Sequence, residues 1–231
     1  QVAQFGDASI ASPFTSKLST IASTADIVRQ GRCALVTTLQ MYKILAINCL
    51  LMSYMLSVLY LHGVKSGETQ QVVIALGVAG MFLLLSRAKP LKELSRQRPP
   101  ASIFAPRLLV SVVVQCAVHL AAVAAGVALC APHMPPLSEI DPDADFEPNV
   151  INSVVYLVTS VANASVFGVN YWGAPFMEPM RDNKWLLRVL LANYALFFLA
   201  ATEALWPVND MLELVPMPDD VRWPIVAIMA A

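Results

Sequence analysis

Polar side chains interrupt an otherwise apolar stretch in the first quarter of the chain. Between Cys33 and Leu61 the sequence has no Gly, Pro, Asp or Glu. On a helix, where successive residues are about 100° apart, five of its polar residues fall within an arc of roughly 140°. These five are Thr37, Gln40, Lys43, Asn48 and Tyr54. A polar sector on a membrane helix must face other protein or a water-filled cavity.

Two interpretations of this sector stay open. The polar groups either form hydrogen bonds to neighbouring helices or line a transport or substrate cavity. For the second interpretation we name Gln40, Lys43, Asn48 and Tyr54 as the cavity candidates. A largely uncharged polar cavity suits a substrate that carries amides or hydroxyls, or a helical peptide. Lys43 has a further alternative, because a lysine can extend its ammonium group to the cytosolic interface.

A second polar stripe recurs at helical steps later in the chain. Its members are Asn152, Tyr156, Thr159, Asn163 and Asn170. We favour hydrogen bonds between helices for this stripe, with a cavity wall as the alternative. Gln115 and His119 also share a face, four residues apart. Since no carboxylate is available on that helix, we interpret His119 as a hydrogen-bonded packing residue.

No catalytic or metal-binding pattern is present. The sequence lacks a phosphate-cradling glycine loop, a Ser/His/Asp set, an H-E-x-x-H motif and a paired-cysteine zinc pattern. Asp141, Asp143 and Asp145 lack the glycine and terminal glutamate of a calcium loop. Residues 33–61 and 71–86 contain no carboxylate, the ligand that hard cations commonly need. We therefore predict no catalytic and no metal site, and we expect no ion pump built on these two segments.

The composition is that of a multi-pass membrane protein. Hydrophobic residues make up 57% and charged residues 13% of the 231 residues, whereas soluble domains carry about 25% charged residues. The net charge of −1 favours no nucleic-acid partner. The four cysteines lie in or beside apolar runs and read as small buried hydrophobes.

The hydropathy pattern predicts an all-α membrane protein, a helical bundle of about six transmembrane helices. Because backbone amides in lipid must pair internally, each apolar run is expected to be helical. A helical stalk at residues 22–32 leads into the first span. The expected spans are residues 33–62, 71–86, 106–131, 150–171, 185–206 and 223–231, the last truncated. With no initiator Met at Gln1, we expect the chain to be a piece of a larger protein.

The loop charges predict the orientation. Basic residues gather before the first span, between the second and third, and between the fourth and fifth, whereas the other loops are neutral or acidic. This alternation follows the positive-inside rule for a chain that enters the membrane from the cytosol. The lipid bilayer is therefore an expected partner.

Three gapless segments resemble one known family. They are GDASIASPFTSK at residues 6–17, IVRQGRCALVTTLQM at residues 27–41 and SRAKPL at residues 86–91. The first two resemble the end of the phosphorylation domain and the fifth membrane helix of P-type ATPases. The fuller strings are similar to the type-five, subfamily-A branch of the endoplasmic reticulum, formerly called cation-transporting ATPases.

The resemblance implies a division of the chain and a function for its parent. Residues 1–21 would be the end of the cytosolic phosphorylation domain, and residues 22–231 the stalk and carboxy-terminal transmembrane domain. The parent would use ATP and Mg²⁺, through an aspartyl phosphate, to dislocate mistargeted transmembrane helices from the endoplasmic reticulum membrane. Its partners would be its upstream domains and a transmembrane-helix substrate. No magnesium-binding role passes to Asp7, because the family's aspartates for that role precede Gly6.

Two alternative functions stay open. One is a cation-transporting pump of the same superfamily, which the absence of carboxylates in the first two spans disfavours. The other is a non-enzymatic scaffold or channel with several spans. The resemblance places the phosphorylated aspartate and the nucleotide domain upstream of Gln1, so this chain alone should hydrolyse nothing.

Overall fold

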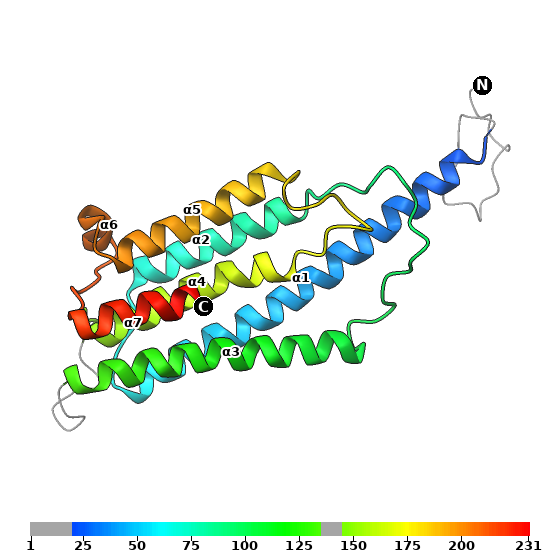
Figure 1. The fold of residues 1–231 in the computed structure, drawn as a ribbon. Coiled ribbons are helices and arrows are strands. Elements are labelled where there is room, and N and C mark those ends of the chain that lie inside the picture. The colour runs from blue at the N-terminus through cyan, green and yellow to red at the C-terminus, as the bar shows by residue number, and fades with distance from the viewer. Residues whose placement is uncertain (1–19, 135–144) are drawn as a thin grey trace.

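The protein is a bundle of helices (Figure 1). The structure, a computed structural model, describes residues 20–134 and 145–231. The elements in these residues are α1 (Ala22–Leu61), α2 (Glu68–Leu85), α3 (Pro106–Cys130), the short 3₁₀ helix η1 (Ala131–His133), α4 (Val150–Asn170), α5 (Lys184–Ala201), α6 (Trp206–Met211) and α7 (Asp219–Ala230).

The predicted membrane bundle is confirmed. Among the described residues, five helices, α1 to α5, are long and apolar enough to cross a membrane. Their bounds match the first five expected spans closely at most ends. The stalk is also helical, because α1 starts at Ala22 and continues through Gly31 without interruption. Helix α7 has 12 residues, or about 18 Å, which is less than the bilayer core needs.

Three helix ends differ from the ends of the expected spans. Helix α2 begins at Glu68. The negative charge of this side chain, in the first turn, interacts favourably with the helix dipole and stabilises the helix start. Helix α5 ends at Ala201 instead of residue 206, because Glu203 takes the left-handed conformation (φ 59°) that ends helices. The chain then forms α6, in a segment that begins within the expected fifth span and continues into an expected loop. Helix α7 begins at Asp219 rather than 223.

Helix α4 lies at the centre of the bundle. It contacts α1, α2, α3, α5 and α7, and 89% of its apolar 18-residue stretch is buried. Aromatic edge contacts fix it on two sides: the ring of Phe167 is 4.9 Å from that of Phe82 on α2, and that of Tyr156 is 5.9 Å from that of Phe197 on α5. By contrast, only 6% of the apolar 18-residue stretch of α3 is buried. Helix α4 is therefore the core, and α3 is peripheral.

Two loops pack together at the end of the bundle beyond which α1 protrudes (Figure 1). These are the α2–α3 loop and the α4–α5 loop. The backbone N–H of Glu178 donates to the carbonyl of Lys89 (2.9 Å), and Pro90 pairs with Met177. The α2–α3 loop carries five Lys or Arg residues against one acidic residue, and Arg181, Lys184 and Arg188 lie at the junction of the α4–α5 loop with α5. The positive-inside rule therefore makes this the cytosolic end.

Several predictions lie outside the described residues. They concern residues 1–19, which include Asp7 and the 6–17 segment, and residues 135–144, which include Asp141 and Asp143 of the three alternating aspartates. The domain boundary at residue 21 stays a prediction.

Candidate functional site: a pocket at the cytosolic end and a polar core

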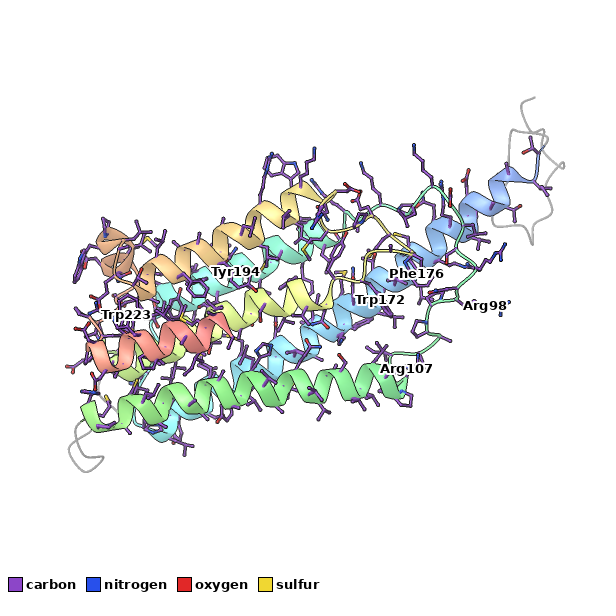
Figure 2. The ribbon with its side chains drawn as sticks, viewed as in Figure 1. Arg98, Arg107, Trp172, Phe176, Tyr194 and Trp223 are labelled. Carbon is purple, nitrogen blue, oxygen red and sulfur yellow. The ribbon has the colours of Figure 1, made fainter. Side chains whose placement is uncertain are left out.

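A pocket of about 280 Å³ opens between α1, α3 and α4 at the cytosolic end. It contains two of the four cavity candidates, Gln40 and Lys43. Figure 2 shows Arg107 and Trp172 at this same end of the bundle. The pocket is lined by Leu39, Gln40, Lys43, Arg107, Leu108, Ser111, Val169, Asn170, Tyr171 and Trp172.

Gln40 forms the back of this pocket. Its side chain is 1% exposed, and its Oε1 accepts a hydrogen bond from the backbone N–H of Trp172 (3.0 Å). Its Nε2 lies 3.7 Å from the sulfur of Met177. Gln40 therefore ties α1 to the start of the α4–α5 loop, 132 residues further along the chain.

Lys43 lies at the side of the pocket nearer α3. Its Nζ donates to the hydroxyl of Ser111 (2.6 Å). Arg107 precedes Ser111 by one helical turn and is exposed. In residues 20–134 and 145–231, no acidic side chain forms an ion pair with Lys43 or Arg107. The pocket therefore carries two cationic groups without a countercharge in this part of the chain.

The other two candidates lie apart from the pocket. Asn48 is 5% exposed, and neither its Oδ1 nor its Nδ2 has a hydrogen-bond partner among the described residues. Tyr54 is half-buried and packs against a cluster of buried apolar side chains that includes Met55 and Val155. The structure thus brings Gln40 and Lys43 together, and it places Asn48 and Tyr54 elsewhere on α1.

The polar stripe of α4 is hydrogen-bonded at both ends, whereas at its centre the one hydrogen bond that the described residues show runs from Asn163 Nδ2 to the sulfur of Met52 on α1 (3.6 Å). At one end, Asn152 accepts from Gln70 (2.8 Å) on α2, and at the other, Asn170 donates to Gln115 (2.7 Å) on α3. Between them, Thr159 Oγ1 and Asn163 Oδ1 are buried without a partner among the described residues. Interhelix hydrogen bonds are therefore confirmed for the two ends of the stripe.

A larger groove of about 770 Å³ lies between α3, α4, α5 and α7. Its wall is mainly apolar, and its polar residues are Gln115, His119, Ser165 and Tyr194. Within the described part of the chain, the His119 ring makes no hydrogen bond. The expectation of a hydrogen-bonded His119 is therefore not met there.

Two arginines on α1 hold the α2–α3 loop. Arg29 donates to the carbonyl of Lys92 (2.9 Å), and Arg32 donates to the carbonyls of Ser95 and Gln97. This contact was not predicted from the sequence, because both arginines were used only to predict the orientation of the chain in the membrane. The spacing of three residues, which places the two on one helix face, was the available signal.

Sequence reasoning also missed Arg107 and Ser111 as pocket residues. Their spacing of four, continued by Gln115, marks one face of α3 and was the signal that could have found them. No cluster of His, Cys, Asp and Glu able to hold a metal ion is found in the residues that the structure describes.

Comparison with known proteins finds an ATPase and helix translocases among the relatives of this chain. No protein-family model matches the chain. The chain is 45% identical over 219 residues to a probable manganese-transporting ATPase of Arabidopsis thaliana (95% of this chain, 18% of that protein). It is 42% identical over 219 residues to the endoplasmic reticulum transmembrane helix translocase of Saccharomyces cerevisiae (95% and 18%). The translocase of Aspergillus fumigatus is 40% identical over 226 residues (98% and 17%). The chain thus spans less than a fifth of the length of these relatives.

Proposed function

Because this chain belongs to the type-five, subfamily-A branch of the P-type ATPases, we propose that it is the carboxy-terminal membrane domain of an ATP-driven helix translocase. The complete protein would extract mistargeted transmembrane helices from the endoplasmic reticulum membrane. It would use ATP and Mg²⁺, which its upstream domains would bind. The endoplasmic reticulum membrane is its location, as the names of the relatives and the five apolar helices indicate.

The observation that carries this proposal is the continuity of α1. Its 40 residues form one helix of about 60 Å, twice the thickness of the hydrocarbon core. Figure 1 shows α1 protruding beyond the other helices at the cytosolic end. A helix without a break transmits displacement along its length. A movement imposed on its cytosolic part by a phosphorylation domain would therefore reach Asn48 inside the bundle.

The packing of α1 against α4 favours such a movement. Asn48 on α1 and Thr159 and Asn163 on α4 carry buried polar atoms without partners among the described residues. Each such group costs about 1–3 kcal/mol. The closed bundle is therefore less stable than one with apolar side chains at these three positions would be. Separation of the two helices would let these groups form hydrogen bonds with a polar side chain on an arriving helix.

We propose that Gln40, Asn48 and Tyr54 are the substrate-facing residues of α1. Asn48 contributes most, because its amide is unpaired, whereas Gln40 is held by Trp172 until α1 moves. Lys43 contacts α3 in the pocket, which supports the interfacial alternative given for it above.

Cation transport is the second candidate function, and the name of the Arabidopsis relative favours it. The unpaired buried atoms of Asn48, Thr159 and Asn163 belong to two amides and a hydroxyl, which are hydrogen-bonding groups more than ligands for a hard divalent cation. ATPase assays on the full-length protein, with Mn²⁺ and other metal ions in one series and a transmembrane peptide in another, distinguish the two.

The test of the substrate face uses polar-to-Leu substitutions in the full-length protein. We expect Asn48→Leu to lower peptide-stimulated ATPase about fivefold, the equivalent of one hydrogen bond of about 1 kcal/mol. Asn48→Leu combined with Gln40→Leu should lower it further while expression is retained. Ser57→Leu is the matched control, since Ser57 is exposed on α1 and bonds only within its own helix. Unchanged stimulation in the double variant would remove both residues from the substrate path.

A further inference from the structure

The pocket at the cytosolic end has the chemistry of a site for a lipid headgroup. We propose that it binds the phosphate of an anionic phospholipid from the cytosolic leaflet, between Lys43 and Arg107. This inference does not depend on the transported substrate, and its test reads lipid binding instead of ATPase activity.

The charges of the pocket select an anion. The Lys43 ammonium group has three N–H donors and uses one on Ser111 (2.6 Å), so two remain for a ligand. Arg107 lies one turn before Ser111 on the same face of α3, and its guanidinium adds a planar donor fork that matches phosphate. Neither has an ion-pair partner among the described residues. A phosphate oxygen would supply the missing countercharge.

The depth of the pocket fits a headgroup. Trp172 follows the cytosolic end of α4 and lines the pocket, and indole rings are enriched at the level of lipid headgroups. Arg107 lies in the first turn of α3, at the same end of the bundle (Figure 2). Basic pockets between transmembrane helices on the cytoplasmic side are typical sites for anionic headgroups.

The surface next to the pocket fits acyl chains. On α3, Val110, Val113 and Val118 are 62%, 66% and 62% exposed, which marks a face without a protein partner in the described residues. Arg107 and Val118 are separated by eleven residues of helix, or about 16 Å. One leaflet of the hydrocarbon core is about 15 Å thick. A phospholipid with its phosphate between the two cations would thus lay its chains along this face.

Titration of the full-length protein in detergent with phosphatidylserine, followed by native mass spectrometry, tests the proposal. We expect Lys43→Gln combined with Arg107→Gln to raise the Kd for phosphatidylserine roughly tenfold. Arg107→Gln alone, at an exposed position that cannot disturb the core, should raise it about threefold. Lys43→Arg combined with Arg107→Lys, which keeps both charges, should leave the Kd within about twofold of wild type.

The matched control is Arg98→Gln, an exposed basic residue of the α2–α3 loop outside the pocket (Figure 2). It should leave the Kd unchanged. An equal rise with Arg98→Gln, or no rise with Arg107→Gln, would overturn the proposal. A second arm replaces the lipid with inorganic phosphate. If free phosphate binds as tightly as the lipid, the pocket is a site for a soluble anion. That result would likewise overturn the proposal.

Discussion

At the scale of single residues, the bundle separates polar groups that hold helices together from polar groups that are left without partners. The amide nitrogen of Gln70 illustrates the first kind, while the Oε1 of the same side chain has no partner among the described residues. Gln70 is fully buried and donates to Asn152 Oδ1 (2.8 Å) and to the carbonyl of Leu212 (2.9 Å), so it joins α2, α4 and the segment after α6. Asn48 illustrates the second kind, with both amide atoms unpaired among the described residues.

Removal of Gln70 should destabilise the protein. Gln70→Leu would leave two buried acceptors without their donor, which costs about 1–3 kcal/mol for each unsatisfied group. We expect a lower Tm for the purified full-length protein in a thermal-shift assay.

The neighbouring Gln71 provides the control, because it is only half-buried and its side chain bonds locally to Ser66. Gln71→Leu should change the Tm far less. Equal Tm values for the two variants would show that the contacts of Gln70 contribute little to stability.

Residue roles were only partly predictable from the sequence. Periodicity correctly placed Asn152 and Asn170 on one face, and interhelix hydrogen bonds were expected for them. Their partners could not be named, because Gln70 and Gln115 are 82 and 55 residues away along the chain. Gln70 was overlooked because the apolar run begins at residue 71, whereas the helix begins at Glu68.

At the scale of elements, α1 is joined to the α2–α3 loop as well as to its neighbouring helices. Arg29 and Arg32 hold loop carbonyls of residues 92, 95 and 97. The α4–α5 loop in turn pairs with the α2–α3 loop through Glu178 and Lys89. Displacement of α1 at its cytosolic part therefore pulls on two connections that lead to α2, α3, α4 and α5.

Loss of these arginine contacts should loosen the loop. With Arg29→Gln and Arg32→Gln together, the carbonyls lose charged donors, each bond being worth about 1.5–3 kcal/mol at most. We expect backbone amides of residues 92–97 to exchange with deuterium about tenfold faster, an effect of about 1.4 kcal/mol. Hydrogen–deuterium exchange with mass spectrometry measures this directly.

Arg96→Gln serves as the comparison for this prediction. Arg96 is an exposed basic residue within the same loop, so its replacement changes the loop charge without touching the α1 contact. Exchange rates in the double variant that match those of Arg96→Gln would show that the α1 contact does not order the loop.

Element bounds were predictable where hydropathy alone determines them. The break after α5 was not, because it depends on the turn at Glu203. The carboxylate of Glu203 accepts from the N–H of Met217 (2.8 Å) and pairs with Arg222 on α7 (3.3 Å). Both partners lie more than ten residues later in the chain, so local propensity did not reveal them.

At the scale of the whole molecule, charge and hydropathy together define a direction across the membrane. The cytosolic end carries the basic α2–α3 loop, the arginine contacts and the pocket, while the opposite end carries Glu203, Asp210, Glu213 and the acidic start of α7. All-α architecture and the first five spans followed from the sequence because the bilayer permits little else for apolar runs of this length.

Labelling of introduced cysteines should reveal this direction. In sealed endoplasmic reticulum vesicles with the cytosolic face outward, a membrane-impermeant maleimide should label Arg96→Cys, whereas Asp210→Cys should need detergent. Both positions are exposed. The native chain gives the background, since its four cysteines all lie within helices. Labelling of Asp210→Cys in intact vesicles would reverse the orientation.

The central position of α4 also bears on how the protein is made. During synthesis a membrane helix first meets lipid and the helices that precede it. Helix α4 carries Asn152, Thr159, Asn163 and Asn170, polar groups that are costly to expose to hydrocarbon. Its integration is therefore favoured once α1, α2 and α3 offer a protein surface to receive it. The insertion of α4 thus meets the same physical problem as the one proposed for the substrate of the finished protein. In both cases a membrane helix carries polar groups that are unfavourable in lipid and need a protein surface.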